Sequence, residues 1–91
     1  MNDVFTLEKK EICLLDKTEQ DKTCYGFYVI STQGGADYYA VEAHDGGEGD
    51  MQIIGKDADV CRRIYRSIAE GGVSALHLAE VVRDILTEVL Y

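Results

Sequence analysis

The sequence predicts an α+β domain in which an antiparallel meander of three to four strands is followed by a two-helix hairpin packed on one sheet face. Residues 1–56 hold β-prone segments separated by glycine and polar turns, whereas residues 57–91 carry apolar residues at helical spacing. The expected order is therefore β-β-β-β-α-α. The 91 residues fit a single domain with one modest core, because a chain of this length buries roughly 60–65% of its unfolded surface.

The first strand is expected over residues 3–15, which have β-prone ends at Val4–Leu7 and Ile12–Leu15. The charged segment Glu8–Glu11 separates these ends. With Phe5 and Leu7 facing in, Cys13 and Leu15 would follow only if the charged Lys9 and Glu11 also faced in. We therefore expect a bulge, a bend or an exposed edge strand in this region. The polar stretch Asp16–Lys22 is expected to form a surface turn.

Residues 23–32 give the strongest strand signal, because aromatic and β-branched residues dominate them. Tyr25, Phe27 and Val29 would share one face of this strand. Gly26 lies on the other face, where a bare position predicts a bulge or the close approach of another element.

A hairpin is expected next, with Gln33–Ala36 turning the chain into a strand over residues 37–43. The segment His44–Asp50 is rich in glycine and acidic residues, so we expect a loop there. A short strand, Met51–Ile54, would complete the sheet.

Two capped helices are predicted after the sheet. Asp57 is the expected N-cap of the first helix, whose apolar stripe is Val60, Cys61, Ile64 and Ile68, with Tyr65 at its margin. Gly71 and Gly72 provide a left-handed stop, and Ser74 is the expected N-cap of a second helix that runs almost to the chain end.

The second helix has a wide apolar stripe, formed by Ala75, Leu78, Val82, Ile85, Leu86 and Val89 and extended by Leu76, Val81 and Leu90. This arc is wider than one sheet face needs. Either the sheet and the first helix both pack on it, or part of it is left for a second subunit. Leu76, Val81 and Leu90 are the candidate interface residues of such a homodimer.

The charge balance excludes several classes of partner. The net charge is −8, with 9 Lys and Arg against 17 Asp and Glu, and residues 1–56 and 57–91 are both acidic. Nucleic acids and anionic membrane surfaces attract basic patches, so we expect neither as a partner. Cys13, Cys24 and Cys61 form no C-x-x-C pair. With no signal peptide or membrane span visible, we expect a cytoplasmic protein with reduced thiols.

Three side chains of the second helix form a candidate functional surface. His77, Glu80 and Asp84 are spaced i, i+3, i+7 and lie along one side, where they could hold a metal ion or transfer a proton. The favoured interpretation is structural, with the His77 side chain reaching back toward the helix start and the two carboxylates solvated.

Two further clusters have competing interpretations. His44, Asp45, Glu48 and Asp50 offer ligands for a hard cation, but they lack EF-hand spacing and are typical of an acidic surface turn. On the first helix, Arg62, Arg63 and Arg66 could bind an anion such as a phosphate. Asp59 and Glu70 are i, i+4 partners of Arg63 and Arg66, however, and these pairs favour a solvated helix face.

No catalytic set is visible in the sequence. There is no G-x-S-x-G elbow and no phosphate-binding loop of the G-x-x-x-x-G-K-[ST] type. The helical hairpin resembles a DNA-binding helix-turn-helix. The exposed side of its second helix has more carboxylates than cations, however, which argues against contact with DNA phosphates. The exposed residues are His77, Glu80, Arg83, Asp84 and Glu88. We therefore predict no catalytic residue, cofactor site or metal site.

The run Ser74–Leu86 resembles the closing motif, roughly S-x-x-H-L-x-D/E-V-V-x-D-F/I-L, of small clostridial proteins of the domain of unknown function 6514 family. The resemblance continues more weakly at Tyr25–Gly26 and at Ile54–Val60. Because that family has no assigned activity, the resemblance implies the order of the fold and transfers no chemistry. It adds interest to His77 and Asp84, which are polar positions of the motif.

Together these observations favour a non-enzymatic protein-interaction module that self-associates. The competing hypothesis is a small metal-dependent or acid–base site on the polar face of the second helix, at His77, Glu80 and Asp84.

Overall fold

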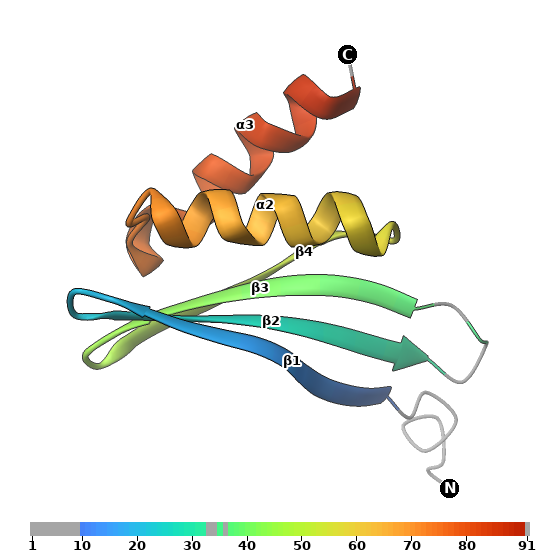
Figure 1. Cartoon of the computed structure of the whole chain (residues 1–91), viewed down its shortest axis with the longest axis horizontal. Coiled ribbons are helices and arrows are strands. Elements are labelled where there is room, and N and C mark those ends of the chain that lie inside the picture. Colours follow the sequence, from blue (N-terminus) through green and yellow to red (C-terminus); the bar gives the residue numbers. More distant parts are fainter. Residues whose placement is uncertain (1–9, 33–34, 36, 91) are drawn as a thin grey trace, which may run out of the picture.

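The computed structural model describes residues 10–32, 35 and 37–90 (Figure 1). For Lys10, Val89 and Leu90 it describes the backbone only. Its strands are β1 (Lys10–Gln20), β2 (Thr23–Thr32), β3 (Asp37–Asp45) and β4 (Glu48–Gly55). The helical part comprises α2 (Ala58–Glu70), a 3₁₀ turn η1 (Ala75–His77) and α3 (Leu78–Leu90).

The four strands form one antiparallel meander in the order β1-β2-β3-β4, which confirms the predicted β-β-β-β-α-α fold. Figure 1 shows α2 lying across one face of the sheet, with α3 rising obliquely beyond it. Within the described part of the chain, both helices are on this face. The described residues leave the opposite face of the sheet uncovered, and β1 and β4 are the edges of the four-stranded sheet.

The prediction of a surface turn at Asp16–Lys22 is wrong, because β1 continues to Gln20. Only Asp21 and Lys22 turn the chain, and Asp21 takes the left-handed conformation (φ 56°) that tight hairpins need. An edge strand tolerates polar residues, which is why the composition of this stretch misled the prediction. Of the alternatives expected for residues 3–15, the edge position is present, and a bulge lies between Leu14 and Asp16, beyond the charged segment Glu8–Glu11. The expected strand before Lys10 lies outside the described residues.

The predicted loop at His44–Asp50 is also wrong. β3 runs through Asp45 and β4 begins at Glu48, so that Gly46 and Gly47 alone make the turn. Gly46 has a φ of 61°, which a glycine adopts without the strain of a side chain. The acidic and glycine residues around the turn hid two strand ends. Of the expected Gln33–Ala36 turn, only Gly35 is described, and its amide donates to the Thr32 carbonyl at 3.0 Å.

The core lies between the sheet and the helices. Its sheet side includes Tyr25 and Phe27, which are fully buried as the alternation in β2 predicts. The Phe27 ring stacks on the ring of Tyr39 at 5.7 Å and on that of Tyr65 at 5.3 Å between centroids. The helices complete the cluster with Cys61, Ile64, Tyr65, Ile68, Leu78 and Val82.

Both predicted caps of α2 are present. The Asp57 carboxylate accepts hydrogen bonds from the amides of Asp59 at 3.0 Å and Val60 at 3.1 Å. At the other end Gly72 has a φ of 66°, and the amide of Val73 donates to the Ile68 carbonyl at 3.3 Å. This pairing is a Schellman motif, which satisfies the last carbonyls of the helix.

The second helix starts differently from the prediction. Ser74 precedes the 3₁₀ turn η1, and its side chain makes no capping hydrogen bond. The Ala75 amide donates instead to the Asp45 carboxylate of β3, at 3.3 Å. The Tyr25 hydroxyl donates to the Val73 carbonyl at 2.6 Å. Two sheet residues thus hold the connection between the helices, and α3 proper begins only at Leu78.

Candidate functional site

A groove of 320 Å³ lies between α2 and α3. Ile85 of α3 lines one side of the groove. The other wall is formed by four residues of α2 at spacing i, i+3, i+4, i+7, namely Val60, Arg63, Ile64 and Ser67. This spacing presents a continuous stripe along one side of α2. Val60 and Ile85 are only partly buried. The groove is therefore mostly apolar, with the Arg63 side chain among its lining residues.

The charges beside this groove have no partners within the described part of the chain. The expected i, i+4 pairs of Arg63 with Asp59 and of Arg66 with Glu70 do not form. Among the described residues, His77–Glu80 is the only ion pair. Arg62 lies instead over the Phe27 ring, 5.2 Å from its centroid. Arg63 and Arg66 are exposed on α2, and Asp84 and Glu88 are exposed on α3.

The sequence-predicted surface on the second helix is partly assembled. Nδ1 of His77 lies 3.6 Å from a carboxylate oxygen of Glu80, and both side chains are well exposed. Asp84 is exposed one turn further along the helix. The His77 ring therefore faces Glu80, and an exposed pair of this kind contributes little to stability. Among the residues described, no group of three or more His, Cys, Asp or Glu side chains could hold a metal ion.

The three interface candidates lie in different environments. Leu76, in η1, has 78% of its surface exposed. Val81 is partly buried against the core. Leu90 is the last residue of α3, and its side chain is outside the described set.

The four residues of the predicted acidic loop serve separate purposes. Asp45 holds the start of η1 through one oxygen, and its other oxygen is buried without a hydrogen-bond partner in the described structure. The His44 ring packs over Gly49 on the neighbouring strand. Asp50 accepts a hydrogen bond from the Gln52 amide at 2.9 Å. Glu48 is exposed at the start of β4.

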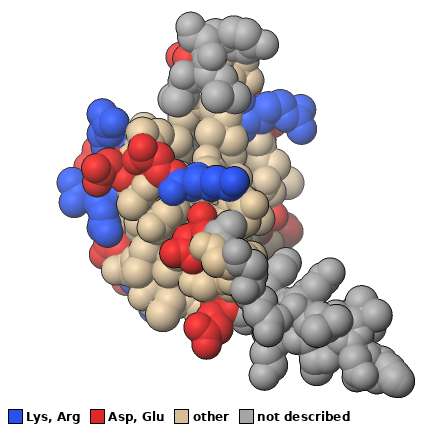
Figure 2. Space-filling model, turned by 90° about the vertical axis from the view of Figure 1, so that its right-hand side faces the viewer, with Lys and Arg blue, Asp and Glu red and all other residues tan. Residues whose placement is uncertain are grey.

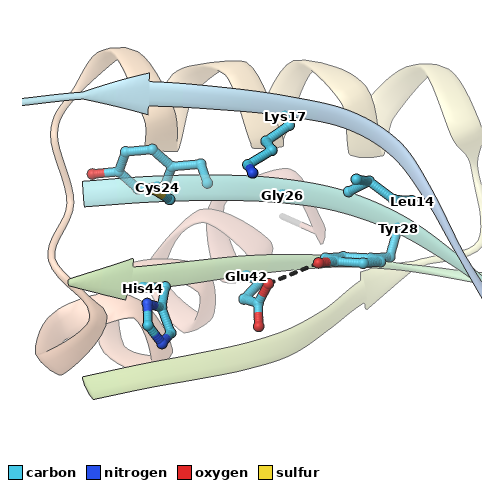
Figure 3. Close-up of a pocket in the computed structure, with 8 residues that line it drawn as sticks. Leu14, Lys17, Cys24, Gly26, Tyr28, Glu42 and His44 are labelled. Atoms are coloured by element: carbon cyan, nitrogen blue, oxygen red, sulfur yellow. Dashed lines mark hydrogen bonds between the residues drawn. The ribbon is translucent and has the colours of Figure 1, made fainter. Parts of the chain in front are cut away.

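A hollow of 260 Å³, which was not predicted from the sequence, lies on the open face of the sheet. Figure 3 shows side chains from β1, β2 and β3 around the bare Gly26, and they include Leu14, Lys17, Cys24, Tyr28, Glu42 and His44. Two of them are joined, since the Tyr28 hydroxyl donates to the Glu42 carboxylate at 2.8 Å. Register brings these residues together. The bare Gly26 is a signal in the sequence, but the bulge or approaching element that it predicts is instead a regularly paired position beneath the Tyr28 ring, and the sequence assigns Lys17 to a turn.

The acidic groups of this face keep its hydroxyl and thiol neutral. The hydrogen bond to Glu42 raises the pKa of Tyr28, with burial adding to the effect. The Cys24 thiol donates to Glu19 at 3.4 Å, and this hydrogen bond is the main cause that raises the pKa of Cys24. A thiol reacts as its thiolate. Cys24 is therefore poorly suited to act as a nucleophile.

Fold and surfaces together define a two-layer α+β domain with a grooved helical layer and an open sheet face. Neither a family model, nor a curated protein, nor a solved structure matches the chain. In the part of the chain that the structure describes, no helix is both long and apolar enough to cross a membrane.

Proposed function

We propose that this protein is a non-enzymatic interaction module that self-associates through its helical layer. In the proposed homodimer, α3 of each copy packs along the groove between α2 and α3 of its partner. The observation that carries the proposal is the 320 Å³ groove, which is mostly apolar and is bordered by charges of both signs that form no ion pair among the described residues. Such an exchange is isologous, so it closes into a dimer.

The apolar surfaces suit this arrangement. Val60, Ile64 and Ile85 line the groove, and the Ile85 and Leu86 side chains of α3 are only half-buried in the single copy. Figure 1 shows the C-terminal part of α3 standing away from the sheet, where a neighbouring helix has access to it. Burying this surface is favourable by about 25 cal/mol for each Å² of apolar area.

The charges favour a second copy over other occupants. α2 presents Arg63 and Arg66 beside the groove, while α3 presents Asp84 and Glu88 near Ile85. In a twofold pair, the cations of each α2 would meet the anions of the partner's α3 on both sides. Complementary charge of this kind fixes the register of an interface and excludes wrong partners. On the face in Figure 2, acidic and basic side chains are interspersed, and no continuous basic field is visible.

We also propose that the protein is a member of the domain of unknown function 6514 family and resides in the cytoplasm. The motif over Ser74–Leu86 supports membership of the clostridial domain of unknown function 6514 family. The free thiols of Cys13, Cys24 and Cys61 suit the reducing cytoplasm.

Charge reversal with rescue tests the dimer. Light scattering coupled to size exclusion, over a wide range of protein concentration, is expected to show a monomer–dimer equilibrium. Arg63→Glu and Glu88→Arg should each weaken the dimer about tenfold or more, because each places like charges across the interface. The variant with both changes should recover most of the affinity. Lys22→Glu, in the turn between β1 and β2, is the matched control and should leave the equilibrium unchanged.

Three results would overturn the proposal. A monomer at every concentration would remove it. A dimer that ignores both single reversals would place the interface elsewhere. Loss of dimer in both single variants without recovery in the double variant would show that the two residues do not meet.

A further inference from the structure

The open face of the sheet carries a cation and an anion in one row across three strands. Lys17 of β1 pairs with Gly26 of β2, and Gly26 pairs with Glu42 of β3. Tyr25 and Phe27, on either side of Gly26, point into the core, so this row faces away from the helices. Two strand spacings separate the backbones of Lys17 and Glu42, a distance of about 10 Å.

Neither charge in this row is neutralised by an ion pair within the described residues. Lys17 is exposed, and Figure 3 shows its side chain extending over β2 beside Gly26. Glu42 uses one carboxylate oxygen to accept the Tyr28 hydroxyl at 2.8 Å. Its second oxygen has no hydrogen-bond partner among the side chains described, so a ligand can use it.

Gly26 creates the space between these two charges. A Cβ atom at this position would lie 2.7 Å from a ring carbon of Tyr28, so the end of the Tyr28 ring occupies part of this space and the 260 Å³ hollow lies beside it. Leu14 and Tyr28 are neighbours in the adjacent cross-strand row and give the hollow an apolar side. The hollow thus combines an apolar side, formed by Leu14 and the Tyr28 ring that packs against Gly26, with opposite charges at Lys17 and Glu42.

We propose that this hollow binds a small zwitterion of the α-amino acid class with an apolar side chain. The carboxylate of the ligand pairs with the Lys17 ammonium group and its own ammonium group pairs with the Glu42 carboxylate. The apolar side chain lies against Leu14 and the Tyr28 ring. A zwitterion fits because a ligand with a single charge would satisfy one group and leave the other unpaired.

Three related probes test the charge requirement. L-leucine carries both charges, leucinamide only the cation, and 4-methylpentanoate only the anion. Calorimetric titration, together with amide NMR shifts around Gly26, should show that leucine binds in the hollow. Each half-charged probe should bind about tenfold more weakly, since it forms one charge-assisted hydrogen bond fewer.

Two variants and one control assign the contacts. Lys17→Met and Glu42→Gln should each weaken leucine binding about tenfold. Glu42→Gln retains an acceptor for the Tyr28 hydroxyl, and Lys17 is exposed, so both variants should fold as the wild type does. Lys22→Met removes a lysine outside the hollow and should leave leucine binding unchanged. Repeating the titration on Arg63→Glu separates this site from self-association.

The proposal is overturned if leucine shifts no amide around Gly26. It is equally overturned if the three probes bind with the same affinity, because the paired charges would then have no role. A loss of binding in Lys22→Met as large as that in Lys17→Met would show an effect of net charge alone.

Discussion

Gly26 shows how one missing side chain organises the open face of the sheet. A Cβ atom placed there would lie 2.7 Å from a ring carbon of Tyr28, closer than side chains pack. The Tyr28 ring is held in this position by its hydrogen bond to Glu42. Gly26 therefore determines both where the Tyr28 ring lies and where the hollow opens.

At the residue scale we predict that Gly26→Ala destabilises the fold. The new methyl group must displace the end of the Tyr28 ring and with it the hydrogen bond to Glu42, and the loss of this bond costs about 1 kcal/mol. Gly47→Ala is the matched control, because no atom lies within 4 Å of the added Cβ, and its effect should stay within about 0.5 kcal/mol. Urea unfolding followed by circular dichroism measures both, and equal effects would contradict the account of Gly26.

At the scale of elements, the two helices begin by different means. α2 is capped locally by Asp57, whose carboxylate accepts two backbone amides. The start of η1 depends on Asp45, thirty residues earlier in the chain. The first helix can therefore be recognised from its own sequence. The second takes its starting point from the sheet.

This difference predicts unequal effects of two similar substitutions. Asp57→Ala should lower the free energy of unfolding by about 1 kcal/mol, the usual cost of a lost N-cap. Ser74→Ala should change it by less than about 0.5 kcal/mol, because the Ser74 side chain makes no capping hydrogen bond. Thermal and urea unfolding of both variants check this pair. A Ser74→Ala cost as large as that of Asp57→Ala would show that Ser74 caps the helix in solution.

Sequence predicted best those elements whose signals are local. The apolar stripe of α2, its Asp57 cap and its Gly72 stop lie within one segment, and all three are present. The extension of β1 to Gln20 could not be seen, because polar residues on an edge strand look like a turn. The cluster around Gly26 depends on the pairing of three strands. Pairing across strands leaves no periodicity within any one of them, so the hollow could not be predicted.

For the whole molecule, buried thiol and phenol groups connect stability to alkaline pH. Burial is the main cause that raises the pKa of Cys61 above its ordinary value of 9.0. It likewise raises the pKa of Tyr25 and Tyr65 above 10.0. The folded state therefore binds these protons more tightly than the unfolded chain does. The resulting stability is complete below the unfolded pKa values and is lost as pH rises through the folded ones.

We accordingly predict a free energy of unfolding that is insensitive to these groups at neutral pH and falls as pH rises above about 9. Tyr65→Phe should reduce the part of this fall that lies above pH 10.0. The same variant should lose about 1 kcal/mol at neutral pH, because the Tyr65 hydroxyl is hydrogen-bonded to Thr18 at 2.7 Å. Urea unfolding at a series of pH values measures both effects. A stability that stays level well above pH 10.0 would contradict the prediction.

The bulge between Leu14 and Asp16 bears on how the protein behaves at high concentration. Among the described strands β1 is an edge, and it exposes Ile12 (57%), Leu14 (50%) and Leu15 (42%), a composition that favours pairing with strands of other molecules. The bulge breaks the register in the middle of this stretch, so an incoming strand cannot pair along the full edge. A protein that associates through its helices, as proposed, would stop at pairs, whereas strand addition at β1 would have no end and would lead to fibrils.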